Sequence, residues 1–246
     1  PRTRAKQSVC HQITSTTPSM KTFPRCVILA WLLATASFLN GAAVEKGFTS
    51  IFNGKDLTGW EGMPGMWMVK DGAITPKQST INNWVFWRGG QPADFELRLS
   101  FRFHSGNSGV QVRTIEFEPF QSRGYQVEVA PQAKMGLWHH SKAPEKYRSK
   151  LALAGEETVY AKDGTKSIKK VADPDKVKSA YKEDEWNDLV VIAKGPTVIQ
   201  KINGVVFSQL TDHDEKYSTS KGWIAFQDHG KGTKVEFKNI RIRIDK

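Results

Sequence analysis

The stretch Asp94-Phe95-Glu96-Leu97-Arg98-Leu99-Ser100-Phe101-Arg102-Phe103 decides the fold. Every second residue from Phe95 to Phe103 is apolar, and the residues between are polar or charged. Successive side chains in a strand point to opposite faces, so this alternation predicts a strand with one face in a core and the other toward water. A helix would need its apolar residues three or four positions apart.

The same two-residue period recurs along the rest of the chain. It appears in the ranges 110–113, 125–129, 189–193, 198–202, 205–209, 223–226 and 235–244. Asn203-Gly204, between two of these runs, predicts a type I′ hairpin. Only residues 173–182 resemble a helix, opened by Asp173-Pro174. We therefore predict an all-β fold, an antiparallel two-sheet β-sandwich of the jelly-roll kind.

Composition excludes several classes of protein. The 246 residues are 39% hydrophobic and 11% aromatic, enough to bury a full core, which excludes an intrinsically disordered chain and a disulfide-dependent mini-scaffold. The least patterned part, residues 142–184, is rich in Lys, Asp, Glu and Gly. We expect it to be a long insertion over one end or face of the sandwich.

The first 43 residues have the pattern of a removable export signal. Lys21 and Arg25 precede an apolar run at 26–39, and Gly41-Ala42-Ala43 is a small-residue cleavage site. The run is shorter than the roughly 20 residues that a membrane-spanning helix needs, so no stable membrane anchor is expected. Met20 is the expected translation start. A secreted or periplasmic location follows for a single domain over residues 44–246.

The charge balance changes once this leader is set aside. The chain has 36 Lys and Arg against 25 Asp and Glu, a net charge of +11. Five of the basic residues lie in residues 1–43, which leaves 36 − 5 = 31 against 25, or +6. No aromatic residue interleaves with the run Lys166, Lys169, Lys170, Lys176 and Lys178. No nucleic-acid partner is therefore expected, and a solvated basic loop is the better interpretation. Both cysteines, Cys10 and Cys26, lie in the leader.

Eight short phrases follow one another along the chain: Ile51-Phe52-Asn53-Gly54-Lys55-Asp56-Leu57-Thr58-Gly59-Trp60, Trp67-Met68-Val69-Lys70-Asp71-Gly72, Asp94-Phe95-Glu96-Leu97, Asn107-Ser108-Gly109-Val110-Gln111-Val112-Arg113, Gly124-Tyr125-Gln126-Val127-Glu128, Glu185-Trp186-Asn187, Lys201-Ile202-Asn203-Gly204 and Phe226-Gln227-Asp228-His229-Gly230. Their order and spacing resemble the 3-keto-disaccharide hydrolase family, from about Phe48 to Ile244. The resemblance implies a secreted bacterial protein with a concanavalin A-like jelly roll that acts on glycosides whose sugar carries a ketone at carbon 3.

A ketone at carbon 3 acidifies the proton on carbon 2. A base can then remove that proton, form an enolate and expel the glycosidic oxygen from carbon 1, after which water adds back. This route needs a general base, an acid for the leaving oxygen and donors for the enolate oxygen. No cofactor is predicted, no metal-ligand cluster with convincing spacing appears, and the metal requirement is left open.

Glu128 is the principal candidate for the acid or base. Strand alternation puts Gln126 and Glu128 on one face, and it does the same for Gln111 and Arg113. We expect these four side chains to be neighbours across adjacent strands, with Arg113 holding Glu128 ionised or binding the sugar. The alternatives are a solvent face for Glu128 and a surface ion pair for Arg113.

Two further polar clusters and two tryptophans complete the candidate site. His139 and His140 are adjacent, so at most one should enter the site, because adjacent strand residues face opposite ways. Trp138 and Trp87 are our candidates for stacking on a sugar ring. The candidate substrate-binding cluster after the strand at 223–226 is Gln227-Asp228-His229, although Asp228 also suits a turn and His229 a structural role.

Three functions compete. The first is an exported hydrolase of 3-keto-glycosides or 3-keto-disaccharides, which would bind a carbohydrate as its partner. The second is a carbohydrate-binding, lectin-like module without catalysis, which needs only aromatic and amide groups on an open face. A third, calcium-dependent lectin has no Asp-rich loop to support it.

Overall fold

Strand β6 (Phe95–Ser105) forms as the alternation predicts, in the interior of a sheet between β13 (Asn187–Lys194) and β17 (Lys234–Ile244). Its apolar residues, such as Leu97 and Phe101, are buried. The computed structural model describes residues 45–77, 80–140 and 148–245. The predicted leader, residues 1–43, lies outside the described residues.

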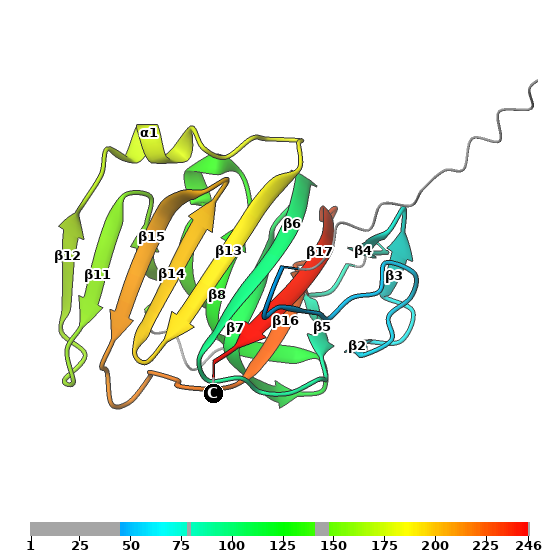
Figure 1. Cartoon of the computed structure of the whole chain (residues 1–246), viewed down its shortest axis with the longest axis horizontal. Coiled ribbons are helices and arrows are strands. Elements are labelled where there is room, and N and C mark those ends of the chain that lie inside the picture. The colour runs from blue at the N-terminus through cyan, green and yellow to red at the C-terminus, as the bar shows by residue number, and fades with distance from the viewer. Residues whose placement is uncertain (1–44, 78–79, 141–147, 246) are drawn as a thin grey trace, which may run out of the picture. The chain divides into compact units, whose positions relative to one another are not determined.

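The larger of two sheets has ten strands (Figure 1). Its order is β12 (Lys166–Lys170), β11 (Glu156–Tyr160), β15 (Val205–Asp212), β14 (Thr197–Ile202), β13, β6, β17, β4 (Ala73–Pro76) and β3 (Trp67–Lys70), and β1 (Thr49–Ser50) pairs with β17. All of these pairs are antiparallel except β11 with β15, which is parallel.

The smaller sheet has seven strands and lies behind the larger one in Figure 1. Its order is β10 (Lys150–Leu153), β9 (Gly136–His140), β8 (Gln121–Val129), β7 (Ser108–Glu118), β16 (Trp223–Asp228), β5 (Asn83–Trp87) and β2 (Trp60–Gly62). A short 3-10 helix, η1 (Gln132–Lys134), links β8 to β9, and one α-helix, α1 (Pro174–Lys178), precedes β13.

Apolar residues from both sheets meet between them. β6 contributes Leu97 and Leu99, and β8 contributes Val127, all fully buried in one continuous cluster. Burial of side chains of this size is worth about 1.5–3 kcal/mol each, which makes this interface the main source of stability. The described part of the chain is therefore an all-β jelly-roll sandwich, as predicted.

The local predictions hold for the eight periodic runs, each of which lies within one strand. Asn203 and Gly204 both have positive φ, 49° and 84°, as a type I′ turn between β14 and β15 requires. Asp173 caps helix α1 by accepting a hydrogen bond from the Asp175 amide. The helix ends earlier than the predicted 173–182, at Lys178.

The stretch predicted as a loop-like insertion is largely regular where it is described. Residues 148–184 contain β10, β11, β12 and α1, and two of these strands extend the larger sheet. A loop was the wrong prediction for this stretch: β12 is exposed at every residue and shows no apolar alternation, and β10 and β11 are runs of only four and five residues. The lysines of β12 are solvated on a strand rather than on a loop, and charge on an edge strand also discourages pairing with another chain.

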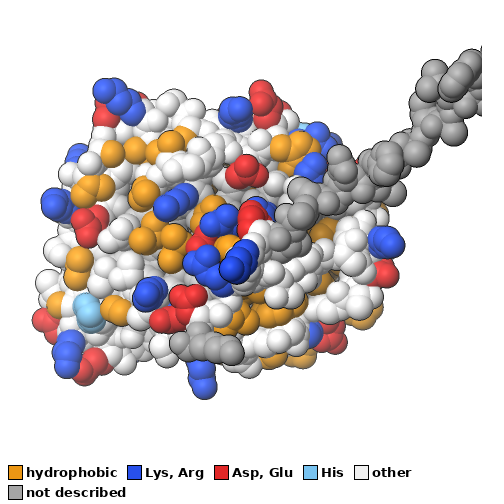
Figure 2. Space-filling model, in the orientation of Figure 1, with side chains coloured by type: hydrophobic (Ala, Val, Ile, Leu, Met, Phe, Trp, Pro, Cys, Tyr) orange, Lys and Arg blue, Asp and Glu red, His pale blue; other side chains and the backbone are white. Residues whose placement is uncertain are grey.

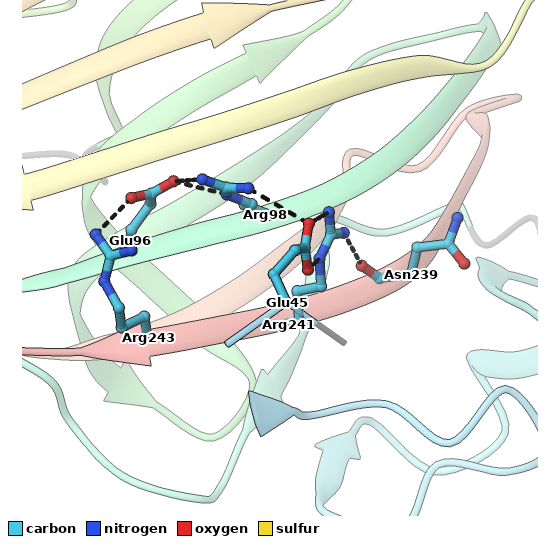
Figure 3. Close-up of polar contacts among 6 residues, drawn as sticks. All are labelled: Glu45, Glu96, Arg98, Asn239, Arg241 and Arg243. Atoms are coloured by element: carbon cyan, nitrogen blue, oxygen red, sulfur yellow. Dashed lines mark hydrogen bonds and ion pairs between the residues drawn. The ribbon is translucent and has the colours of Figure 1, made fainter. Parts of the chain in front are cut away.

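Ion pairs fix the segment that leads into β1 (Figure 3). Glu45 accepts two hydrogen bonds from Arg241 of β17, both 2.6 Å long, and a third from Arg98 of β6. Phe48 lies beneath the guanidinium groups of Arg98 and Arg243. Positive and negative side chains are interspersed over this face of the larger sheet (Figure 2). No helix among the described residues is long and apolar enough to cross a membrane.

Candidate active site

A strip of polar side chains lies on the outer face of the smaller sheet, the face turned away from the core. The pairing of neighbouring strands places these side chains side by side. Gln111 of β7 is opposite Gln126 of β8, and Gln126 is opposite Trp138 of β9. Glu128 of β8 is opposite Gly109 of β7. The residues that alternate with them, such as Val127, are in the main core. We call Gln111, Gln126, Glu128, Trp138, His140 and Gln227 the polar strip.

The three glutamines of the strip form a chain of hydrogen bonds that ends on Glu128. Gln111 Nε2 donates to Gln126 Oε1 at 2.7 Å, and Gln126 Nε2 donates to Glu128 Oε2 at 2.6 Å. The Gln126 amide also donates to Gln227 Oε1 at 3.1 Å, and Gln227 donates to Asn82. The predicted neighbour relation of Gln111, Gln126 and Glu128 is therefore correct, and each amide is fixed in orientation by its partners.

The absence of a side chain at Gly109 makes room for this chain. A Cβ atom at that position would lie 2.4 Å from the Gln126 side-chain carbonyl carbon. Gln126 therefore lies directly across the Gly109 backbone, beside Glu128.

Glu128 is only 4% exposed. Burial raises the pKa of its carboxyl group to about 7, and hydrogen bonds from Gln126 and Asn107 and the charge of Lys134 oppose the rise. A carboxyl group with this pKa exists in both protonation states near neutral pH. It can therefore give a proton as well as take one.

The two histidines face opposite ways, as adjacent strand residues must. His139 points into the core, where its ring is edge-on to Tyr125 at 6.1 Å, and burial lowers its pKa to about 3. His140 lies on the outer face, edge-on to Trp84 at 4.9 Å. His140 is thus the histidine that belongs to the polar strip, and His139 is a core residue.

The hydrogen bond of His140 fixes its tautomer. Its Nδ1 lies 3.0 Å from the Ser122 carbonyl oxygen, which can only accept, so Nδ1 carries the hydrogen. Burial lowers the pKa of His140, which keeps the ring neutral near pH 7. Nε2 of the neutral ring is then an unprotonated acceptor, as a general base requires.

Register also gives the separation of the two titratable groups. His140 is opposite Gly124 on β8, four residues before Glu128. At the rise of a β-strand this is about 13 Å between α-carbon positions. Gln126 and Trp138 lie between them along the strip.

Arg113 does not join the strip, which corrects the prediction. Its guanidinium donates to the Ala93 and Gly195 carbonyl oxygens and pairs with Asp94 at 3.0 Å. The register shifts between Val112 and Ile115, and Arg113 has a positive φ of 49°. This bulge breaks the alternation that placed Arg113 beside Gln111, and the side chain instead ties two loops together.

Of the two predicted stacking tryptophans, only Trp138 lies on the outer face. It is half-buried, donates through Nε1 to the Lys134 carbonyl oxygen and has Lys150 over its ring. Trp87 is 8% exposed and belongs to the main core, so it is not placed to stack on a sugar. Every residue of β5 is buried, so the sequence contained no polar alternation from which to choose the face.

The cluster after β16 divides between the two faces. Gln227 is in the polar strip, whereas Asp228 points the other way and accepts hydrogen bonds from Asn83 and the Gly230 amide. Asp228 thus has the turn-forming arrangement that was the alternative to sugar binding. His229 is exposed at the end of the strand.

Sequence reasoning missed Trp84 and Asn107. Trp84 lies on the outer face with Phe86 and Ala225, apart from the main core, and its buried Nε1 has no hydrogen-bond partner in the described structure. Asn107, whose side chain hydrogen-bonds Glu128, has a buried Oδ1 that also lacks a hydrogen-bond partner among the described residues. Unpaired buried polar atoms are costly, so both mark places where a polar ligand would be stabilising. The phrase Asn107-Ser108-Gly109 was a detectable signal for one of them.

The polar strip does not coincide with a cleft that lies elsewhere in the described structure. That cleft lies on the larger sheet, between β4 and β17, and has a volume of about 460 Å³. Among the described residues, no group of three or more His, Cys, Asp or Glu side chains is placed to hold a metal ion. We therefore choose the polar strip as the candidate active site because of its hydrogen bonds and titratable groups, and not because of an open cavity.

Comparison with known proteins supports the fold and shows the family. Two crystal structures of candidate glycosyl hydrolases from Parabacteroides distasonis are similar to this chain. One is 21% identical with a TM-score of 0.52 and covers 81% of this chain and 94% of its own. The other is 18% identical with a TM-score of 0.56 and covers 80% and 99%. No curated protein matches the chain. The model of the 3-keto-alpha-glucoside-1,2-lyase-like domain matches residues 47–243, so the chain belongs to that family.

Proposed function

We propose that this domain cleaves glycosides of 3-keto sugars by elimination across carbons 1 and 2, followed by hydration. One observation carries the proposal. Glu128 and His140 lie on one strip, and their pKa values are shifted in opposite directions by burial. Near neutral pH, burial favours a carboxyl group that keeps its proton and an imidazole that is neutral, so the two groups are suited to act as an acid and a base at one pH. Family membership supplies the substrate class.

In the proposed reaction, His140 Nε2 takes the proton from carbon 2 of the keto sugar. The electron pair of that bond forms the carbon 1–carbon 2 double bond, and the bond from carbon 1 to the glycosidic oxygen breaks. The Glu128 carboxylic acid protonates the departing oxygen. Water then adds its hydroxyl group to carbon 1 and a proton returns to carbon 2, which gives the free keto sugar.

The remaining residues of the strip bind and polarise the sugar. The Trp84 ring lies beside His140, and its Nε1 has no hydrogen-bond partner among the described residues, so it is suited to donate to the ketone oxygen as negative charge develops there. Gln126 and Gln227 present amides that are already fixed by one another. Preorganised donors of this kind stabilise a transition state without the cost of reorientation.

Substrates with different leaving groups on carbon 1 distinguish the role of the acid from the role of the base. A nitrophenolate leaves without protonation, whereas an alkoxide does not. We therefore expect Glu128→Gln to lose activity on alkyl 3-keto-glucosides and to keep most of it on nitrophenyl 3-keto-glucosides, and His140→Gln to lose both. His213→Gln, an exposed histidine outside the strip, is the matched control and should behave as wild type.

The pH profile gives an independent check of the assignment. With His140 as base and Glu128 as acid, activity falls as pH rises through about 7, because Glu128 loses its proton. Activity that instead rises through pH 7, with Glu128→Gln inactive on both substrates, would make Glu128 the base and reverse the roles.

A carbohydrate-binding module is the second candidate, and the partly exposed ring of Trp138 on this face favours it. Such a module needs aromatic and amide groups, which Trp138, Gln126 and Gln227 supply. Binding of keto-glucosides and ordinary glucosides with no sugar release from any of them would establish this function and exclude the enzyme.

We further propose that the protein is exported, on the strength of the predicted leader at residues 1–43. Expression of the full chain in a bacterium should yield a protein whose first residue, by N-terminal sequencing, lies near Val44. Retention of the leader on the purified protein would contradict export by this signal.

A further inference from the structure

The cleft on the larger sheet lies beside two strands that are joined by few backbone hydrogen bonds. β4 and β17 share a single paired position, Ile74 with Phe237. Beyond it the backbone ladder is replaced by one side-chain bond, from Thr75 Oγ1 to the Val235 carbonyl oxygen at 2.8 Å. The cleft has a volume of about 460 Å³, which is within the size range of small-molecule sites.

Positive charge dominates the lining of this cleft. Lys70, Lys77, Arg102 and Lys234 carry four positive charges, against two negative charges on Asp71 and Glu236, which leaves +2 when His104 is not counted. The three lysines are exposed and make no ion pair within residues 45–77, 80–140 and 148–245. Their ammonium groups are available to a ligand.

One wall of the cleft is held rigid by its own ion pairs. Arg102 donates two hydrogen bonds to Glu236, at 2.7 and 3.1 Å, and these bonds lower the pKa of Glu236. His104 bridges Glu236 and Asp184 through its two ring nitrogens. Because Arg102 satisfies Glu236, that carboxylate does not cancel the charge of the lysines.

The rest of the lining suits a sugar ring. Met68 supplies partly exposed apolar surface, and the Thr75 hydroxyl, which donates to the Val235 carbonyl oxygen, can still accept a hydrogen bond from a sugar. A volume of about 460 Å³ is much larger than an inorganic anion fills. Positive charge, a hydroxyl group and apolar surface together match a saccharide that carries carboxylate groups.

We propose that the β4–β17 cleft is a second carbohydrate site that binds acidic saccharides, such as oligomers of a uronic acid. The cleft lies on the larger sheet and the polar strip lies on the smaller one, so this site is separate from the candidate active site. It would hold the enzyme on an acidic polysaccharide while the strip acts on its own substrate.

The test is calorimetric titration of the purified protein at low salt with a short oligogalacturonide. The matched ligands are the same oligomer after methyl esterification, which removes its charge, and sodium sulfate at equal charge concentration. Lys70→Gln/Lys234→Gln removes two cleft charges, and Lys169→Gln/Lys170→Gln removes two from the exposed strand β12 as the control.

We expect the oligogalacturonide to bind and the esterified oligomer not to. The cleft double variant should bind about tenfold more weakly, because it loses charge-assisted hydrogen bonds, and the β12 variant should match wild type. Absence of binding, an equal effect of both double variants, or equally strong binding of sulfate would overturn the proposal. Glu128→Gln should bind the oligomer normally, which keeps this result independent of the proposed reaction.

Discussion

At the scale of single residues, the burial of Glu128 has a consequence for stability as well as for chemistry. Its pKa is about 7 in the folded protein and near 4.5 when exposed. A raised pKa means that the folded state prefers the protonated form, so the stability from this group is complete below pH 4.5 and is lost as pH rises through 7. The difference corresponds to about 3 kcal/mol.

Glu128→Gln should remove this pH dependence, because its amide stays neutral. We expect the variant to gain stability relative to wild type between pH 5 and pH 8, by up to about 3 kcal/mol. Urea unfolding at the two pH values measures it. Glu185→Gln, at an exposed position, is the control and should show no such gain. A variant whose stability relative to wild type is the same at both pH values would show that Glu128 is not titrating in a buried site.

Gly109 gives a second prediction at this scale. A methyl group there would displace the Gln126 amide and break its hydrogen bond to Glu128. We expect Gly109→Ala to fold, since its φ is not positive, and to lower kcat on a 3-keto-glucoside by at least tenfold, about 1.4 kcal/mol. Gly54→Ala, where nothing lies within 4 Å of the added atom but φ is 73°, is the comparison for backbone strain without displacement of Gln126. Unchanged kcat in Gly109→Ala would remove Gln126 from the mechanism.

Single residues also show where sequence reasoning stopped. The positions of Gln111, Gln126 and Glu128 were predictable because regular alternation places them. Arg113 was not, because a bulge is a backbone feature with no side-chain period of its own. Trp84 and Trp87 were not separable, because a strand buried on both faces has no polar side.

At the scale of elements, the hairpin of β7 and β8 folds back against β5. The Trp84 amide donates to the Phe120 carbonyl oxygen, and Gln121 Nε2 donates to the Asn82 carbonyl oxygen. Glu116 near the tip accepts two hydrogen bonds from Arg88, at 2.6 and 3.0 Å. Because Trp84 and Glu128 are buried, we expect substrate entry to require movement of the elements over this face.

Arg88→Gln should therefore loosen the hairpin. The pair is partly exposed, so we expect a loss of about 1 kcal/mol of local stability and roughly fivefold faster hydrogen exchange of the Trp84 amide. Arg102→Gln removes a similar pair from the other sheet and should leave that amide unaffected. Equal exchange in Arg88→Gln and wild type would show that the Arg88–Glu116 pair does not hold the hairpin.

β12 is one of several strands that the periodicity did not predict, with β10 and β11 in the same stretch. Its residues Lys166–Lys170 are exposed on both faces of the strand, so their sequence shows no alternation of apolar and polar residues. Its pairing with β11 is set by backbone hydrogen bonds, which any side chain permits. The periodic strands of the sandwich interior were predictable for the opposite reason, since each has a face that must be apolar.

At the scale of the whole molecule, charge is distributed so that ion pairs join distant parts of the chain. Arg241 hydrogen-bonds Glu45 and so holds the pKa of that carboxyl group at about 2 (Figure 3). A lowered pKa means that the pair stabilises the fold above pH 4.5 and that its contribution is lost as pH falls toward 2. Glu45 is half-exposed, which limits its contribution to about 1 kcal/mol.

Glu45→Gln should consequently be less stable than wild type at pH 7 by up to about 1 kcal/mol, and the deficit should shrink as pH falls below 4.5. Urea unfolding at pH 7 and pH 3 measures it, and added salt should reduce the deficit at pH 7. A deficit that is as large at pH 3 as at pH 7 would mean that packing, rather than charge, is lost in the variant.

The central claim, elimination across carbons 1 and 2, is tested most directly by the fate of the hydrogen on carbon 2. An alkyl 3-keto-glucoside is cleaved in D₂O, and the keto sugar is analysed at early times against an enzyme-free sample of the same product. Elimination and hydration predict one deuterium at carbon 2 in each product molecule, beyond the background exchange. Cleavage with the original hydrogen retained at carbon 2 would contradict the account.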